Sequence, residues 1–136
     1  MQKLTINTKK EKEIFDLTEL INDLIVKSAY DKGVCHLFVT HTTCALTTAD
    51  LDPGTEEDMI NAFEKMIPSL EYKHKHDPEH VPDHIMSAII SPSLTIPVQN
   101  ASMVLGSWQR VVLVELSGPK ERHLAMTFIK DKRKTI

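Results

Sequence analysis

The amino-acid sequence predicts an α+β domain in which mixed or antiparallel β-sheets are packed with helices. Three observations lead to this prediction. Short segments rich in β-branched residues lie towards both ends, amphipathic segments with helix-start signals lie between them, and turn residues separate the two kinds. The 136 residues have the length of one domain with a single core. We therefore treat residues 1–136 as a single domain.

The N-terminal part of the chain predicts a strand followed by a helix. Residues 3–8 alternate polar and apolar side chains, which is typical of a strand. Asp16 is a favourable N-cap residue, and Glu19 three positions later completes a capping box. The next apolar residues recur at helical spacing and form one stripe, which consists of Leu17, Leu20, Ile21, Leu24 and Ile25. We expect Gly33 to end this helix.

Residues 34–48 predict a buried strand that runs into a threonine-rich strand. Apolar side chains up to Val39 give way abruptly at His41 to Thr42 and Thr43, and β-branched residues dominate the segment. A core element would thus deliver hydroxyls and an imidazole to one place, as in many functional sites. A threonine-rich strand whose hydroxyls face solvent explains the same residues, so both interpretations stay open.

A second helix and a histidine-rich loop follow. Residues 50–58 form a turn whose acidic residues suit the N-terminus of a helix, and Asp52 lies in this turn. The core-facing residues of the helix are expected to be Met59, Ile60, Phe63, Met66 and Ile67. Residues 72–84 hold four of the seven histidines in a proline-containing loop, and Pro82 opens a short third helix.

The C-terminal part predicts a run of strands at residues 94–98, 103–105, 109–116 and 123–129. The segment Ser117-Gly-Pro-Lys120 fits a hairpin turn between the last two strands.

Charge and composition exclude several classes of function. The net charge is −3 and the pI is about 6.1, whereas nucleic-acid or anionic-membrane binders carry a basic excess. Only residues 130–134 are locally basic, as is common for a solvated terminus. No apolar run approaches the roughly 18 residues of a membrane span, and the N-terminus has no signal core, so we expect a cytoplasmic protein with no membrane or nucleic-acid partner. Cys35 and Cys44 lack a CxxC spacing and are expected to be buried hydrophobes.

Histidines are the first candidate site residues. Four lie in one loop, namely His74, His76, His80 and His84. With His41 they contain enough imidazoles for the three nitrogen ligands of an open zinc-type site, and Asp52 is a candidate fourth ligand or an acceptor that orients a ring. The spacing matches no tight zinc motif, and a solvated histidine-rich loop is the alternative.

A second cluster surrounds the only tryptophan, Trp108. Gln109 beside it offers hydrogen bonds to a substrate, and in strand geometry Gln109 shares a face with Glu115. A buried Glu115 would need a partner such as Arg122 or a metal. Lys120 and Arg122 are candidate phosphate contacts. The alternatives are a core position for Trp108 and ordinary exposed hairpin charges for the two cations.

An ordered set of short segments extends over nearly the whole chain. The segments are His41-Thr-Thr-Cys-Ala-Leu-Thr47, Asp52-Pro53, Tyr72-Lys-His74, Pro82-Asp-His84-Ile85, Ser93-Leu-Thr-Ile-Pro-Val98, Leu105-Gly-Ser-Trp-Gln109, Glu115 and Gly118. Together they resemble the YjbQ-like, or secondary thiamine-phosphate synthase, family. The resemblance implies an α+β domain that assembles as a homotrimer with a polar pocket. It also favours His41, His74 and His84 as the metal ligands, because these three fall on family motif positions.

The resemblance further implies an activity on small phosphorylated molecules. Family members are associated with joining a pyrimidine methyl diphosphate to a thiazole phosphate with release of pyrophosphate. In such a transferase a divalent metal ion, zinc or magnesium, would serve the phosphates together with Lys120, Arg122, Thr42 and Thr43. Trp108 would stack on a substrate ring.

Two other functions remain open at this stage. One is a metal-dependent hydrolase in which Glu115 or Asp52 accepts the proton of a metal-bound water. The other is a non-enzymatic trimer that binds a metal or a small anion.

Three departures from the family pattern affect the pocket. Residues 48–51 carry the single carboxylate of Asp50, where many members have an Asn-Glu-Asn type run. Lys120-Glu-Arg122 stands in place of Arg-x-Arg, which weakens a bidentate phosphate clamp because lysine binds phosphate as a point charge. Ser91-Pro92 replaces a glycine often found before the Ser-Leu-x-x-Pro run.

Overall fold

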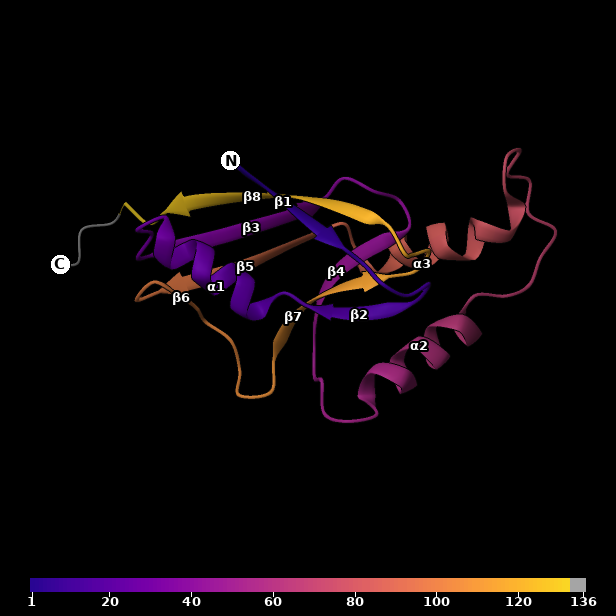
Figure 1. The fold of residues 1–136 in the computed structure, drawn as a ribbon, viewed down its shortest axis with the longest axis horizontal. Coiled ribbons are helices and arrows are strands. Elements are labelled where there is room, and N and C mark those ends of the chain that lie inside the picture. The colour runs from indigo at the N-terminus through magenta and orange to yellow at the C-terminus, as the bar shows by residue number, and fades with distance from the viewer. Residues whose placement is uncertain (133–136) are drawn as a thin grey trace.

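Two antiparallel sheets and three α-helices make up the described part of the chain (Figure 1). The computed structural model describes residues 1–132. The larger sheet has the strand order β1-β8-β3-β5-β6 and the smaller one β2-β7-β4. The strands are β1 (Gln2–Asn7), β2 (Glu13–Asp16), β3 (Gly33–Val39), β4 (Cys44–Ala49), β5 (Ser93–Gln99), β6 (Ser102–Met103), β7 (Arg110–Glu115) and β8 (Glu121–Lys130). All these pairs are antiparallel, so the α+β prediction is confirmed in its antiparallel form.

Strand β7 is buried on both faces because it lies between two hydrophobic clusters. Val111 and Leu113 face the main core, which is shared by α1 (Thr18–Lys27) and the inner face of the larger sheet. Val112 and Val114 face a second cluster under α2 (Thr55–Met66) and α3 (Val81–Ile90). The smaller sheet is therefore the middle layer, and its continuous apolar run reflects burial from two sides.

The structure differs from the prediction at the start and end of α1. Strand β2 occupies residues for which no strand was predicted, and Leu17 rather than Asp16 is the N-cap. Asp16 Oδ1 nevertheless accepts the Thr18 N–H at 3.0 Å. The helix ends before Ser28, so Gly33 begins β3 and does not end α1. Leu20 is 39% exposed, which shows that the buried stripe is narrower than predicted.

The helix α2 packs loosely. Its partly buried apolar residues cover the second cluster, but none is fully buried, and Met66 is 60% exposed rather than in the core. A short 3₁₀ turn, η1 (Pro78–His80), leads into α3, which begins at Val81 beside the predicted Pro82. No helix within the described residues 1–132 is long and apolar enough to cross a membrane. The basic segment 130–134 lies partly outside the described residues.

Two of the connections between the sheets, the two crossings, lie together at one end of the molecule. Residues 40–43 connect β3 to β4, and residues 116–120 connect β7 to β8. The predicted hairpin at 117–120 is therefore wrong, because β7 and β8 belong to different sheets. The Leu116 N–H donates to Thr43 O at 3.2 Å and ties the crossings together. A Cβ at Gly118 would collide with the carbonyl of Lys10, so glycine is required there.

Candidate functional site

A buried ion pair holds the two crossings in place. Arg122 is 2% exposed and Glu115 is fully buried. The guanidinium donates to Glu115 from Nε at 2.8 Å and from Nη2 at 2.5 Å. Arg122 Nη2 also donates to Thr43 Oγ1 at 2.9 Å and Thr43 O at 3.1 Å. These contacts join β7, β8 and the end of the first crossing.

Further donors complete the coordination of the Glu115 carboxylate. Thr8 Oγ1 donates to Oε2 at 2.9 Å, and the Ser117 N–H donates to Oε1 at 3.0 Å. Burial by itself would raise the pKa of Glu115, but hydrogen bonds from Arg122, Ser117 and Thr8 outweigh burial and hold this pKa below its usual value. Glu115 is thus ionised and fully engaged. The geometry makes Glu115 and Arg122 a structural support for the site, where the sequence offered them as a proton acceptor and a phosphate ligand.

His41 lies at the surface of this support. The His123 N–H donates to His41 Nε2 at 2.8 Å, so the neutral imidazole carries its proton on Nδ1. The two histidine rings stack with their centroids 5.6 Å apart. Burial lowers the pKa of His41, and the neighbouring charges of Arg122, His123 and Lys120 lower it further. The result is a neutral N–H donor in a positively charged neighbourhood.

Ser117 links this neighbourhood to the start of α3. Lys120 Nζ donates to Ser117 Oγ at 3.1 Å, and Ser117 Oγ lies 3.2 Å from His80 Nδ1. His80 Nδ1 is also 3.2 Å from Asp83 Oδ2, and its Nε2 is 3.2 Å from Asp77 Oδ2. His80 therefore belongs to the polar region although it lies off the motif positions.

His74 and His84 form a second stacked pair with ring centroids 5.4 Å apart. His84 Nδ1 donates to Thr42 O at 3.2 Å, so in the neutral ring the lone pair lies on Nε2. His74 Nδ1 accepts the N–H groups of His76 and Asp77 at 3.2 and 3.1 Å, which places its proton on Nε2. The pair thus presents one neutral acceptor and one neutral donor, next to the first crossing.

The predicted three-histidine metal site does not fit this arrangement. His74 and His84 stack together, whereas His41 directs Nε2 to the backbone of His123. Within residues 1–132 no group of three or more His, Cys, Asp or Glu side chains is placed to hold a metal ion. The tautomers agree with this, because both His41 and His74 already use one nitrogen as an acceptor and protonate the other.

The structure separates Asp52, Trp108 and Gln109 from the histidines. In the β4–β7 ladder Cys44 pairs with Glu115 at one end and Ala49 pairs with Arg110 at the other. Five residues of strand separate these ends by about 17 Å. At the far end Gln109 Nε2 donates to Thr48 Oγ1 at 3.1 Å, and Trp108 is 73% exposed beside a shallow hollow that Asp52 also lines. Trp108 is therefore not a core residue.

His123, Thr8 and Ser117 belong to the site but were not among the predicted site residues. His123 meets His41 because β3 and β8 are paired antiparallel with Val39 opposite Leu124. Thr8 follows β1, whose Asn7 pairs with Glu121. The sequence contains no signal for these registers, since they pair residues more than eighty positions apart. The cysteines were predicted correctly to be buried, and burial raises the pKa of the Cys35 thiol to about 12 and that of Cys44 to about 11.

Comparison with known proteins gives consistent matches over nearly the whole chain. A family model described as UPF0047 protein YjbQ-like matches residues 2–131. A UPF0047 protein of Mycobacterium tuberculosis H37Rv is 32% identical over 121 residues, which is 88% of this chain and 89% of the relative. A UPF0047 protein of Methanocaldococcus jannaschii is 31% identical over 131 residues, 96% and 94% of the two chains. Among solved structures, a YbjQ-like protein of unknown function from Sulfolobus solfataricus P2 is 27% identical with a TM-score of 0.88 over 96% of both chains.

Proposed function

Because the chain belongs to the UPF0047 protein YjbQ-like family, we propose that it acts on small phosphorylated molecules. The proposed activity is that of a thiamine-phosphate synthase, which joins a pyrimidine methyl diphosphate to a thiazole phosphate. The observation that carries the proposal is the neutral His41 N–H donor near Lys120, a cation that forms no ion pair with another residue in the described range 1–132. Such a surface attracts an anion and can donate to it without losing a proton.

The reaction requires few catalytic groups from the protein. The bond between the pyrimidine methylene carbon and its oxygen breaks, and the electron pair leaves with pyrophosphate. The thiazole nitrogen then shares its lone pair with that carbon to form the thiazolium product, and no net proton transfer is required. The side chains must neutralise the leaving group and align the two rings. His41 Nδ1 and Lys120 are assigned to the leaving group, with Thr42 beside them.

The buried residues have a supporting part in this proposal. Arg122 and Glu115 hold the crossings through Thr43 and do not reach the substrate. No step is assigned to a metal ion at His41, His74 and His84, because their geometry does not fit one. His84 Nε2 and His74 Nε2 remain an acceptor and a donor for the second substrate.

A turnover assay tests the proposed function. Untagged protein is incubated with the two phosphorylated substrates, with and without added magnesium or zinc, while pyrophosphate release and thiazolium formation are followed. We expect the two products in equal amounts. Saturable binding of pyrophosphate without turnover would instead indicate a non-enzymatic anion-binding protein. Turnover that requires zinc and disappears in His74→Ala would contradict the metal-free assignment of the histidines.

We also propose that the outer face of the larger sheet forms the contact of a homotrimer. Alternate residues of β3 and β5 point away from the core, and those on β3 are Val34, His36 and Phe38. Phe38 is 41% exposed and Ile129 on β8 is 58% exposed. A sheet face whose central strand exposes aromatic and aliphatic groups is suited to contact with identical copies.

Replacing Phe38 by lysine is expected to dissociate this assembly without unfolding the chain. A charge at the centre of an apolar contact would be desolvated without a partner, which opposes association. Light scattering during size-exclusion chromatography would then show the mass of one chain, 15.4 kDa, in place of three times this value. Val26→Lys, an exposed apolar position on α1, is the control. A monomeric wild type, or a Phe38→Lys trimer, would refute the proposed contact.

A further inference from the structure

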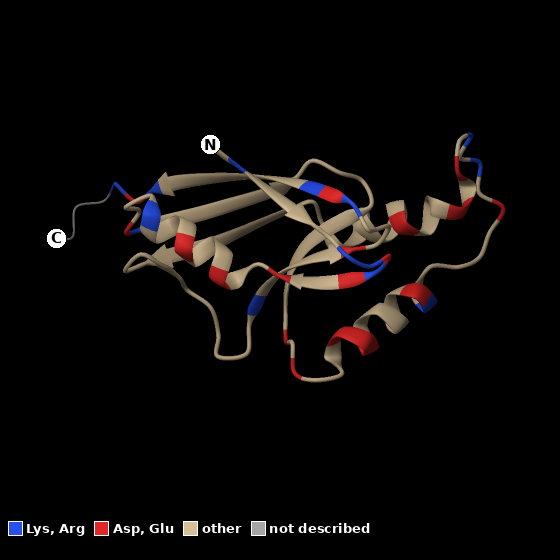
Figure 2. Ribbon diagram, in the orientation of Figure 1, with Lys and Arg blue, Asp and Glu red and all other residues tan. Residues whose placement is uncertain are grey.

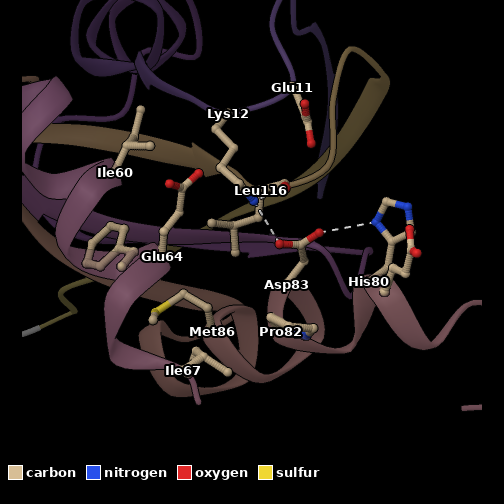
Figure 3. A pocket seen from close by; sticks show the side chains of 12 residues that line it. Glu11, Lys12, Ile60, Glu64, Ile67, His80, Pro82, Asp83, Met86 and Leu116 are labelled. Carbon is tan, nitrogen blue, oxygen red and sulfur yellow. Dashed lines mark hydrogen bonds and ion pairs between the residues drawn. The ribbon is translucent and has the colours of Figure 1, made fainter. Parts of the chain in front are cut away.

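A cavity of about 340 Å³ lies between α2, α3 and the segment that enters β2 (Figure 3). Its apolar side chains are Ile60, Phe63, Ile67, Met86 and Leu116. The cavity persists because α2 packs loosely and buries none of its residues completely. Its volume falls within the range of small-molecule sites, roughly 300–1,000 Å³, so it suits a small ligand better than a peptide.

The one lysine of the cavity wall is already neutralised. Lys12 Nζ donates to Asp83 Oδ1 at 2.8 Å and to Leu116 O at 2.9 Å. Asp83 contacts His80 through its other oxygen, and Figure 3 shows this chain of contacts along one wall. The wall therefore offers no free cation for an anionic ligand.

Three carboxylates at the rim of the same cavity are unpaired. Glu11, Glu64 and Glu79 line it, and none of their side chains makes a hydrogen bond or ion pair with another residue in the described range 1–132. Figure 2 shows acidic segments on both α2 and the start of α3, the two elements that flank the cavity. An apolar floor thus meets a rim of uncompensated negative charge.

We propose that this cavity binds a small organic cation, whose apolar body packs on Phe63 and Met86 and whose charge faces Glu11, Glu64 and Glu79. Charge complementarity excludes an anion, since the rim carries three unpaired negative charges. An inorganic cation does not match, because no metal-binding group of three side chains exists among residues 1–132 and the apolar floor offers it no ligands. Aryl-alkyl ammonium compounds combine both required features.

This binding site is separate from the proposed phosphate site. His80 lines the cavity, and its contact with Ser117 lies between the cavity and Lys120. The two surfaces have opposite charge, so they select different ligands or different ends of one ligand. The inference does not depend on thiamine-phosphate synthase activity, and its test measures binding alone.

The test uses 2-phenylethylammonium as the probe and its neutral analogue 2-phenylethanol as the comparison. Methyl NMR spectra of the full chain are recorded during titration. We expect saturable shifts for the methyl groups of Ile60, Ile67 and Met86 but not for Ile96 in the other core. The cation should bind about ten- to thirtyfold more tightly than the alcohol, because each of the three rim carboxylates contributes about a two- to threefold increase.

Two variants and a matched control make the test decisive. Glu64→Gln, an exposed position on α2, should weaken cation binding about threefold and leave alcohol binding unchanged. Ile60→Trp should fill the cavity and abolish both. Asp58→Asn removes the same charge from α2 outside the cavity and should have no effect. The proposal would be overturned if the cation and the alcohol bound equally tightly, or if Glu64→Gln and Asp58→Asn had equal effects. It would also be overturned if no saturable shift occurred up to about 10 mM ligand.

Discussion

Replacing Arg122 by methionine is expected to lower the free energy of unfolding by about 3–5 kcal/mol at neutral pH. The change leaves the Glu115 carboxylate buried and ionised, with only the Thr8 hydroxyl and the Ser117 N–H as donors. It also removes both contacts to Thr43, which join the two crossings. Urea unfolding followed by circular dichroism measures the loss. Arg110→Met is the matched control, because Arg110 pairs with Asp16 and Glu19 at the surface and should cost less than about 1 kcal/mol.

The pH dependence should distinguish loss of charge pairing from loss of packing. In the wild type the pKa of Glu115 is held below 4.5, so this group contributes stability that is present above pH 4.5 and is lost as pH falls through the folded-state pKa. In Arg122→Met the burial of Glu115 dominates and raises the pKa of this carboxyl above 4.5. Acidification should therefore stabilise the variant as Glu115 binds a proton. The difference between the two proteins therefore narrows as the pH is lowered from 7 towards 4.5. A difference that stays constant with pH would assign the effect to packing alone.

Local patterns in the sequence predicted those strands and helices in which buried residues recur at one regular spacing. Strand β3 alternates buried Cys35, Leu37 and Val39 with outward residues, and it lies where it was expected. The antiparallel sheets and the three helices also agree with the predicted fold class. Strand β2 was missed because its residues Glu13–Asp16 coincide with helix-start signals. Residues 13–16 form a strand because they pair with β7, which lies almost a hundred residues away in the sequence.

Contacts between residues distant in the sequence also explain what the sequence could and could not predict of the site. The polar segment at His41 was identified, since an apolar strand ends abruptly there, and a partner was correctly predicted for a buried Glu115 in Arg122. Which face of the molecule each residue reaches depends on the crossings between sheets. The segment 117–120 was predicted to form a hairpin turn, and such a hairpin would have placed β7 beside β8 in one sheet. Trp108 and Gln109 lie far from His41 because they precede the end of β7 that is opposite to Glu115.

Replacing His41 by glutamine is expected to reduce turnover of the proposed transferase by about 10²–10³-fold while the protein keeps its stability. The glutamine Oε1 can accept the His123 N–H that His41 Nε2 accepts in the wild type. The substitution removes the Nδ1–H donor of His41, which is assigned to the leaving pyrophosphate. His41→Asn provides the complementary change, because its amide can replace the Nδ1–H donor but cannot reach the His123 N–H. We therefore expect His41→Asn to be the more active and less stable of the two variants.

The pH profile of turnover adds a second readout on the protonation state of His41. Burial, together with the charges of Arg122, His123 and Lys120, holds the pKa of His41 below 6.5, so the neutral donor is the form present above that pH. Wild-type turnover should be flat from about pH 8 down to 6.5 and fall only at lower pH, where protonated Nε2 can no longer accept the His123 N–H. His41→Gln should lose this acid limb. His36→Gln, an outer-face histidine bonded to Thr95, serves as the control and should retain turnover, profile and the wild-type mass in light scattering. Full activity in His41→Gln would remove His41 from the mechanism and leave Lys120 as the remaining candidate contact for the leaving group.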